Sequence, residues 1–374
     1  MIKTPRLKNF LPYIFIALLF FGFIFLRYGD TLTYKFDPNL IAEYLRSQDI
    51  EDTGNVIKNR IFLSDSDLYL ASGYLYAKGA DPTGYDFQVP ALIKYLFGFS
   101  TLAFGNPYCV QIIFGLVLLW LTYFLGIKLF KNQTVAMIGT GLLLIDPVFG
   151  GMMSGALLDL GQTVFALGFV ISIFFYPESY ILQGIALGLF AASKFWSTAL
   201  IFVFLITVYK VFIRKEKPNF KKAGLVLLIA FIVYCLVYTK TFINLRGEFN
   251  IVLYQVKVLR YMLTHNSAGV PGGPITLFIS GYFLPWWQNG ILRARDWSLL
   301  WPISFFASLL LVLKTKLKDL KFFFYILPIV YLLLTSSQVP FTRYFLIILP
   351  YAYLNLSSLF LFFLKRYNWR NLSY

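Results

Sequence analysis

The sequence is poor in the residues that build metal sites, disulfide frameworks and hydrolytic triads. It has one histidine, His265, and two cysteines, Cys109 and Cys235, among 374 residues. Both cysteines lie in or beside apolar segments, which excludes a disulfide framework and a Cys-x-x-Cys metal site. One histidine makes no histidine cluster, and this argues against a zinc enzyme or a Ser-His-Asp hydrolase of common type. The glycine patterns that bind ATP or dinucleotides are also absent.

Charged residues are scarce as well. They make up 13% of the chain, whereas hydrophobic residues make up 59%. A soluble domain has roughly 25% charged and 45–50% apolar residues. A water-soluble globule of this size cannot bury so many apolar side chains. In a lipid bilayer, apolar side chains on the protein surface contact lipid instead of water. The 41 phenylalanines and 26 tyrosines suit lipid-facing surfaces and interfacial belts.

Ten apolar runs account for most of the chain. They cover residues 10–27, 107–127, 134–148, 157–175, 179–193, 196–213, 223–243, 297–313, 320–337 and 341–364. This pattern predicts an all-α polytopic membrane protein, a bundle of about ten transmembrane helices in a single membrane domain over residues 1–374. No small-residue cleavage site follows the first run, which indicates an uncleaved signal anchor.

The basic residues predict the topology. The net charge of +16 lies in short loops between apolar runs, chiefly 128–131, 214–222, 314–321 and 365–370, and at the N-terminus in Lys3, Arg6 and Lys8. The positive-inside rule places these loops and both termini in the cytoplasm of a multi-pass cell-membrane protein. No basic helix or stacking platform lies outside the membrane, so a nucleic-acid partner is not expected.

Two long loops then fall on the outer side. The first, residues 28–106, holds ten of the 17 acidic residues, and its stretches Ser66–Lys78 and Pro90–Phe104 predict helices along the membrane surface. The second stretch carries Leu92, Leu96 and Phe99 on one stripe, with Lys94 off it. The second long loop, residues 244–296, contains the apolar run Ile275–Trp287, which we expect to be re-entrant or interfacial because of its prolines, its glycines and the pair Trp286–Trp287.

Three acidic residues are the candidates for chemistry. Asp65 and Asp67 form an Asp-x-Asp pair before the first surface helix, which suits a divalent ion or a general base. The alternative is that Asp65 caps the helix and both are solvated. Asp159 opens the fourth span, either as a cap favoured by the helix dipole or as a ligand of a metal or substrate.

Two basic residues lie on the predicted outer side, whereas most others lie in the predicted cytoplasmic loops. Lys194 and Arg343 are the basic residues of the short outer turns. A phosphate ligand at the outer face would explain their positive charge. The alternative is that the two side chains snorkel to anionic lipid.

Five stretches in the same order carry a resemblance to a known family. The sequence resembles the GT-C membrane glycosyltransferases, specifically the protein O-mannosyltransferase branch, family 39 and its relatives. The stretches are SDSDLYLASGYLYAKGADP, DFQVPALIKYLFG, GALLDLGQTVF, GIALGLFAASKFW and TRYFLIILPYAYL. The sequence departs from the family in three places: Ser66 separates the acids, Gln88 replaces an acidic residue or histidine, and Ala91 replaces the second proline. The large loop domain of the family is absent as well.

The resemblance implies transfer of a sugar, a hexose such as mannose, from a polyprenyl-phosphate carrier to an acceptor hydroxyl. The acceptor would be a protein or glycolipid at the outer membrane face, and the displacement would invert the anomeric centre. Asp65 or Asp67 would be the base, and Lys194 and Arg343 would hold the phosphate. The other substrate-binding positions that the resemblance implies are Asp159, Lys94 and Gln88. No cofactor is certain, and a divalent metal stays open, with Asp86, Asp159 and His265 as its candidate ligands.

Other classes of protein fit parts of the pattern. A transporter or flippase for lipid-linked sugars would show charges in mid-span and matching broken halves, and neither is seen. A carrier-lipid ligase or polymerase shares the substrates but usually has its large outer loops late in the chain. A non-enzymatic assembly subunit is the third alternative.

Overall fold

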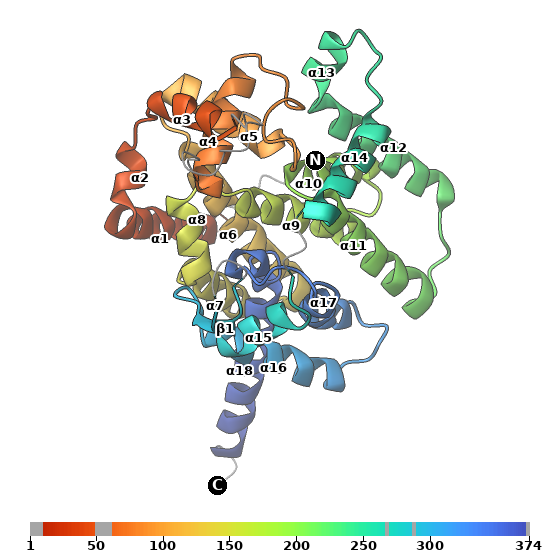
Figure 1. Ribbon diagram of the computed structural model, residues 1–374. Coiled ribbons are helices and arrows are strands. Elements are labelled where there is room, and N and C mark those ends of the chain that lie inside the picture. Colours follow the sequence, from red (N-terminus) through yellow and green to blue (C-terminus); the bar gives the residue numbers. More distant parts are fainter. Residues whose placement is uncertain (1–9, 49–61, 266–268, 286–288, 372–374) are drawn as a thin grey trace.

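The computed structural model describes residues 10–48, 62–265, 269–285 and 289–371, and in these residues the chain is almost entirely helical (Figure 1). Each of the ten predicted runs contains a helix. These helices are α1 (Leu11–Arg27), α6 (Cys109–Phe130), α7 (Gln133–Leu144), α9 (Asp159–Phe175), α10 (Tyr180–Ser193), α11 (Trp196–Thr207, extended by a π-helical turn at Val208–Ile213), α12 (Phe220–Leu236), α16 (Leu300–Lys314), α17 (Leu320–Leu334) and α18 (Leu349–Asn371).

The helices differ in how well their length suits a bilayer. By length and composition, two of the described helical segments are long and apolar enough to cross a membrane, Cys109–Phe130 and Trp196–Ile213. Helix α7 with α8 (Pro147–Ser154) makes a third if the pair counts as one bent span. The other apolar helices have 10–17 residues, short of the roughly 20 that a perpendicular span needs.

The apolar run 134–148 was predicted as a single span, but in the structure it is broken into two helices. Helices α7 and α8 meet at an angle of 55°. Pro147 disfavours a helical backbone at the residue before it, and Asp146 there has extended backbone angles. The Asp146 carboxylate caps α8 by accepting from Val148 N at 2.9 Å. It also accepts from Trp301 Nε1 of α16 at 2.9 Å and from the Tyr353 hydroxyl of α18, so the break joins four helices.

The first long loop folds into α2 (Gly29–Thr33), α3 (Asn39–Gln48), α4 (Asp65–Ala77) and α5 (Leu92–Phe104). Helices α4 and α5 are the two predicted surface helices. They cross at two glycines: a Cβ on Gly98 would lie 1.9 Å from Gly73 O. Helix α3 was not predicted, and the acidic positions Asp49, Glu51 and Asp52 lie outside the described residues.

The predicted orientation of α5 was incomplete. Its buried side carries Ile93, Lys94 and Phe97, whereas Phe99 of the apolar stripe is 52% exposed. In a membrane protein an apolar stripe can face lipid as well as protein. Lys94, off the stripe, therefore lies on the side that packs against the rest of the molecule.

Helix α13 (Thr239–Asn244) lies at the end of the apolar run 223–243, and the second long loop contains α14 (Ile251–His265) and α15 (Gly273–Ser280). The run Ile275–Trp287, predicted to be re-entrant or interfacial, contains most of the eight-residue helix α15 and the strand β1 (Tyr282–Phe283), which pairs antiparallel with β2 (Leu292–Arg293). The pair Trp286–Trp287 lies outside the described residues.

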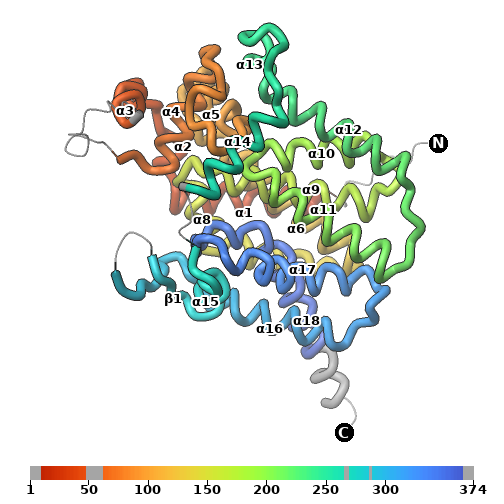
Figure 2. Tube along the Cα trace, turned by 45° about the vertical axis from the view of Figure 1, so that its right-hand side comes forward, coloured from red at the N-terminus to blue at the C-terminus, as the bar shows by residue number. Residues whose placement is uncertain are grey.

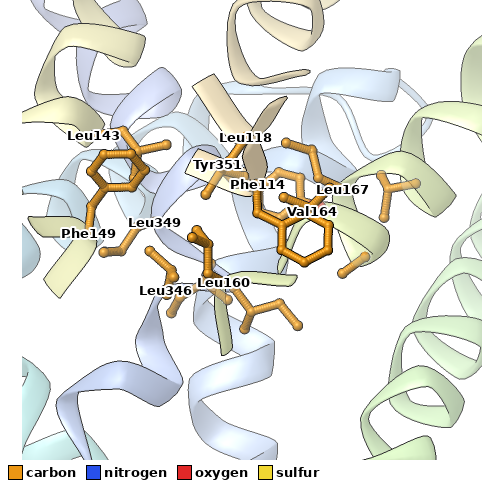
Figure 3. Close-up of a cluster of buried hydrophobic side chains, with 14 of the residues drawn as sticks. Phe114, Leu118, Leu143, Phe149, Leu160, Val164, Leu167, Leu346, Leu349 and Tyr351 are labelled. Atoms are coloured by element: carbon orange, nitrogen blue, oxygen red, sulfur yellow. The ribbon is translucent and has the colours of Figure 1, made fainter. Parts of the chain in front are cut away.

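The larger of two apolar clusters packs most of the bundle together. Figure 3 shows side chains of α6, α7, α8, α9 and α18 meeting in it, among them Phe114, Leu143, Phe149 and Leu160. Leu160 is the second residue of α9, so this core fixes the helix that begins with Asp159. Figure 2 shows the turns between α11 and α12 and between α16 and α17 at one end of the bundle, and α14 and α15 at the other end.

Candidate functional site

Four of the predicted site residues lie together. The Nζ of Lys194 is 2.5 Å from Asp159 Oδ1, and Arg343 Nε is 3.9 Å from Asp159 Oδ2. Arg343 also donates from Nη2 to Asp65 Oδ2. The four side chains come from the first residue of α4, the first residue of α9, the break between α10 and α11, and the turn Thr342–Phe345 (η3) before α18. Two cations and two carboxylates therefore form one cluster.

The start of α4 distinguishes the two acids of the Asp-x-Asp pair. Ser64, not Asp65, is the N-cap: its Oγ accepts from Asp67 N at 3.2 Å and donates to Asp67 Oδ2 at 2.7 Å. Both the backbone N–H and the carboxylate of Asp67 are thus bonded to the hydroxyl of the capping serine. Asp65, at the first helical position, has its carboxylate directed to Arg343, and its side chain is 44% exposed.

Asp159 is placed by the segment before it and by a glycine after it. Its side chain is 5% exposed and opens α9, where the helix dipole favours a negative charge. A Cβ on Gly161 would lie 2.4 Å from Ile93 Cδ1, so this glycine lets α5 approach α9 closely. Asp159 is thus the first residue of α9 and not its N-cap, which is Leu158, and its role as a ligand stays a prediction.

Lys194 lies where the chain passes from α10 to α11, with backbone angles that belong to neither helix. Its side chain is 4% exposed, and the ammonium sits 4.2 Å from the ring centre of Tyr344. A snorkelling lysine would extend its charge to the surface, whereas this one is directed inward to Asp159. Among the described residues, Asp159 Oδ1 is its hydrogen-bond acceptor, so two of its three N–H groups are available to a ligand.

Arg343 is held by η3 and by the second long loop. Its neighbour Thr342 donates to Asp296 Oδ2 at 2.5 Å, and its guanidinium lies over the ring of Phe341, 4.8 Å from the centre. Burial lowers the pKa of Arg343, but Asp159, Tyr344 and Asp65 outweigh it and raise the pKa above its ordinary value. The side chain therefore stays charged at every physiological pH.

Lys94 and Asp86 form a second buried pair beside this cluster. Lys94 is fully buried, with Nζ 3.1 Å from Asp86 Oδ2, 2.6 Å from Asp86 O and 2.9 Å from Val89 O. Three acceptors saturate the three donors of an ammonium group. Burial raises the pKa of the Asp86 carboxyl, while Lys94 acts in the opposite direction. Lys94, predicted to bind substrate, thus donates all three of its N–H groups to the loop between α4 and α5.

Gln88, in the loop between α4 and α5, shares a small cavity with Lys194. It lines a cavity of about 40 Å³ together with Lys194, Trp196, Gln255 and Met262. The first long loop, the break before α11 and helix α14 therefore line one small cavity, to which Lys194 contributes.

The candidate metal ligands do not fit a divalent ion as they stand. Asp159 is paired with Lys194 and Arg343, and Asp86 with Lys94. Within the described part of the chain, no three His, Cys, Asp or Glu side chains are grouped as a metal site. The side chain of His265 lies outside that part. A cation at these carboxylates would have to displace a lysine or an arginine.

Sequence reasoning missed several residues of this region. Tyr69 is buried one turn after Asp65, and burial raises the pKa of its hydroxyl, as do Asp86 and Asp65. Gln111 and Ser66 hold the segment before Asp159, and Tyr344 covers Lys194. The helical spacing of four from Asp65 could have indicated Tyr69; no local pattern marks the other three.

Comparison with known proteins identifies the fold. No protein-family profile and no curated protein sequence matches the chain. Among the solved structures that match over most of it are two of ArnT from Cupriavidus metallidurans. The one bound to undecaprenyl phosphate has a TM-score of 0.57 and 12% identity over 90% of this chain. The apo structure has a TM-score of 0.50 and 13% identity over 93%. This chain spans 60% and 58% of those chains. The predicted fold class, an all-α polytopic membrane protein with a GT-C-like bundle, is thereby confirmed.

Proposed function

From this GT-C membrane glycosyltransferase fold, we propose that the protein transfers a sugar from a polyprenyl-phosphate carrier to an acceptor hydroxyl. The carrying observation is the cluster of Lys194, Arg343, Asp159 and Asp65. The fold neighbour that holds undecaprenyl phosphate supports a lipid-phosphate donor. We further propose that the sugar is a hexose such as mannose, that the acceptor is a protein or glycolipid, and that the cluster faces outward from the cell membrane.

Asp65 is the base in this proposal. Its side chain is 44% exposed, against 5% for Asp159, so an acceptor can reach it. Its Oδ2 accepts a hydrogen bond from Arg343 Nη2, which orients the carboxylate. Asp65 takes the proton of the acceptor hydroxyl while the acceptor oxygen bonds to the anomeric carbon. The bond from that carbon to the phosphate oxygen breaks, with inversion at the carbon.

Lys194 and Arg343 stabilise the departing phosphate. The carrier phosphate gains one negative charge as the sugar leaves, and preorganised cations are most effective where charge develops. Asp159 holds both cations in place when no donor is bound. Its own charge is tolerated in a buried position because it is paired.

The test compares two neighbouring acids of the same helix turn. Vesicles that contain the protein receive radiolabelled polyprenyl-phosphate mannose, and label is measured in the protein and glycolipid fractions. We expect Asp65→Asn to lower transfer by roughly 10²- to 10⁴-fold, the usual contribution of a general base. Asp67→Asn is the matched control, since an amide still serves the helix cap, and should transfer at close to the wild-type rate.

Two outcomes would contradict the proposal. Full transfer by Asp65→Asn would remove the base assignment. Movement of the labelled donor across the vesicle membrane without any transfer by the wild-type protein would favour the transporter instead.

A further inference from the structure

The segment between α8 and α9, residues 155–158, has its backbone bound by side chains from two other helices. Gln111 Nε2 of α6 donates to Gly155 O at 2.7 Å and to Leu157 O at 2.9 Å. Ser66 Oγ of α4 accepts from Ala156 N at 2.9 Å. Three successive residues are therefore fixed by partners that lie 44 to 90 positions away in the chain.

The two side chains that bind this segment are themselves in fixed positions. Gln111 is fully buried. Ser66 is the second residue of α4, between the two acids. It therefore joins the start of α4 to the segment 155–158, and Gln111 joins α6 to the same segment.

The segment leads directly into the cluster. Asp159 follows it and binds Lys194 at 2.5 Å. It also lies 3.9 Å from Arg343, which in turn contacts Asp65, the neighbour of Ser66. The contacts form a closed circuit from Ser66 through Ala156, Asp159 and Arg343 back to Asp65. A displacement of the segment would therefore change the distance between the base and the cations.

We infer that Ser66 and Gln111 are positioning residues, which fix Asp159 and its two cations relative to Asp65. The inference rests on the proposed function for its effect on rate. Misplacement of a reacting group by about 1 Å can cost on the order of 10²-fold in rate. The loss of one hydrogen bond to a segment held by three should cost less.

The first test uses Ser66→Ala in the transfer assay. We expect kcat/KM to fall about tenfold, and Ser66→Thr, which keeps the hydroxyl, to recover most of the loss. Ser72→Ala is the matched control, because it removes a buried hydroxyl of the same helix that bonds to Leu68 O within α4. Its kcat/KM should stay within twofold of wild type.

A double variant separates positioning from a merely structural role. If Ser66 acts through Asp159, Ser66→Ala should change the residual transfer of Asp159→Asn by less than twofold. Gln111→Met, which removes both bonds to the segment, should likewise show non-additive losses with Ser66→Ala. An undiminished tenfold loss in the Asp159→Asn background would overturn the inference.

A measurement without turnover keeps the two proposals distinguishable. Amide hydrogen exchange in the peptide that contains Ala156 should become faster in Ser66→Ala and stay as in wild type in Ser72→Ala. Equal exchange in all three proteins would overturn the positioning role, whatever the assay shows. Full transfer by Asp65→Asn, in contrast, would overturn the base assignment and leave the exchange result unaffected.

Discussion

The two buried lysine–aspartate pairs differ in how their donors are used. Lys94 Nζ has three acceptors within 3.1 Å, and two of them are backbone carbonyls. Lys194 Nζ has one carboxylate oxygen and the face of an aromatic ring. An ammonium group has three donors and no acceptor, so Lys94 is saturated and Lys194 is not. Of the two, Lys194 is the one suited to a phosphate.

This difference predicts how Lys94→Met behaves. The substitution leaves Asp86 buried without its partner, which should cost about 3 kcal/mol at neutral pH. Because burial already raises the pKa of Asp86 and Lys94 lowers it, the pKa in the variant should rise further. When a carboxyl has a higher pKa in the folded than in the unfolded protein, it lowers the free energy of unfolding at pH values above the unfolded pKa. This loss disappears as the pH falls.

Thermal melting in detergent at pH 7 and pH 5 checks the prediction. The melting temperature of Lys94→Met should lie well below that of wild type at pH 7, and the gap should narrow at pH 5. A gap that is constant with pH would contradict the assignment of the loss to Asp86. The donor KM of the folded variant should match that of the wild type.

At the scale of elements, close helix crossings place the site residues. Helices α4 and α5 touch at Gly73 and Gly98. A Cβ on Gly73 would collide with the backbone of α5, and a Cβ on Gly98 would collide with the backbone of α4. Helices α10 and α12 cross in the same manner at Gly184 and Gly188. Small residues allow such approach in membranes, where packing rather than the hydrophobic effect holds helices together. The first crossing sets where Asp65 lies, and the second supports the helix that ends before Lys194.

Gly98→Ala should therefore separate α4 from α5. The added Cβ would meet Gly73 O at 1.9 Å, and this atom is backbone that cannot turn away. We expect a destabilisation of roughly 1–3 kcal/mol, typical of overpacking, together with reduced transfer. Gly141→Ala in α7 is the control, because nothing lies within 4 Å of the position that its new methyl group would occupy.

Thermal melting and transfer are both measured for these two glycine variants. Gly141→Ala should be neutral or slightly stabilising, since alanine favours a helix over glycine. Wild-type stability of Gly98→Ala would show that α4 and α5 can separate freely.

At the scale of the whole molecule, the two ends of the bundle differ in chemistry. The turns with residues 214–219 and 315–319 lie at one end, and α14 and α15 of the second long loop lie at the other (Figure 2). The basic composition of those turns predicts a cytoplasmic location. The cluster would then face the opposite compartment, where nucleotide sugars are absent and a lipid-linked donor is needed.

Labelling from one side of the membrane tests this orientation. In a background with Cys109→Ser and Cys235→Ser, we expect Gly84→Cys to react with a membrane-impermeant maleimide added outside intact cells. Lys217→Cys should react only after the membrane is opened. Both positions are exposed, so access to the reagent is governed by the membrane. Reaction of both from the same side would overturn the topology.

The sequence by itself determined the helical membrane architecture, the positions of the apolar helices, and the list of residues from which the cluster is built. It could do so because apolar runs and loop charges are local signals, and because Asp65, Asp159, Lys194 and Arg343 each stand out against an apolar background. The tertiary structure alone decided how these residues pair. It assigned Asp67 to the helix cap and Asp65 to Arg343, and it turned Lys94 inward. Local sequence patterns could not decide this for two reasons. An apolar stripe can face either lipid or the protein interior, so the stripe on α5 does not show which side packs. The partners Asp65 and Arg343 are 278 positions apart in the sequence and meet only in the folded chain.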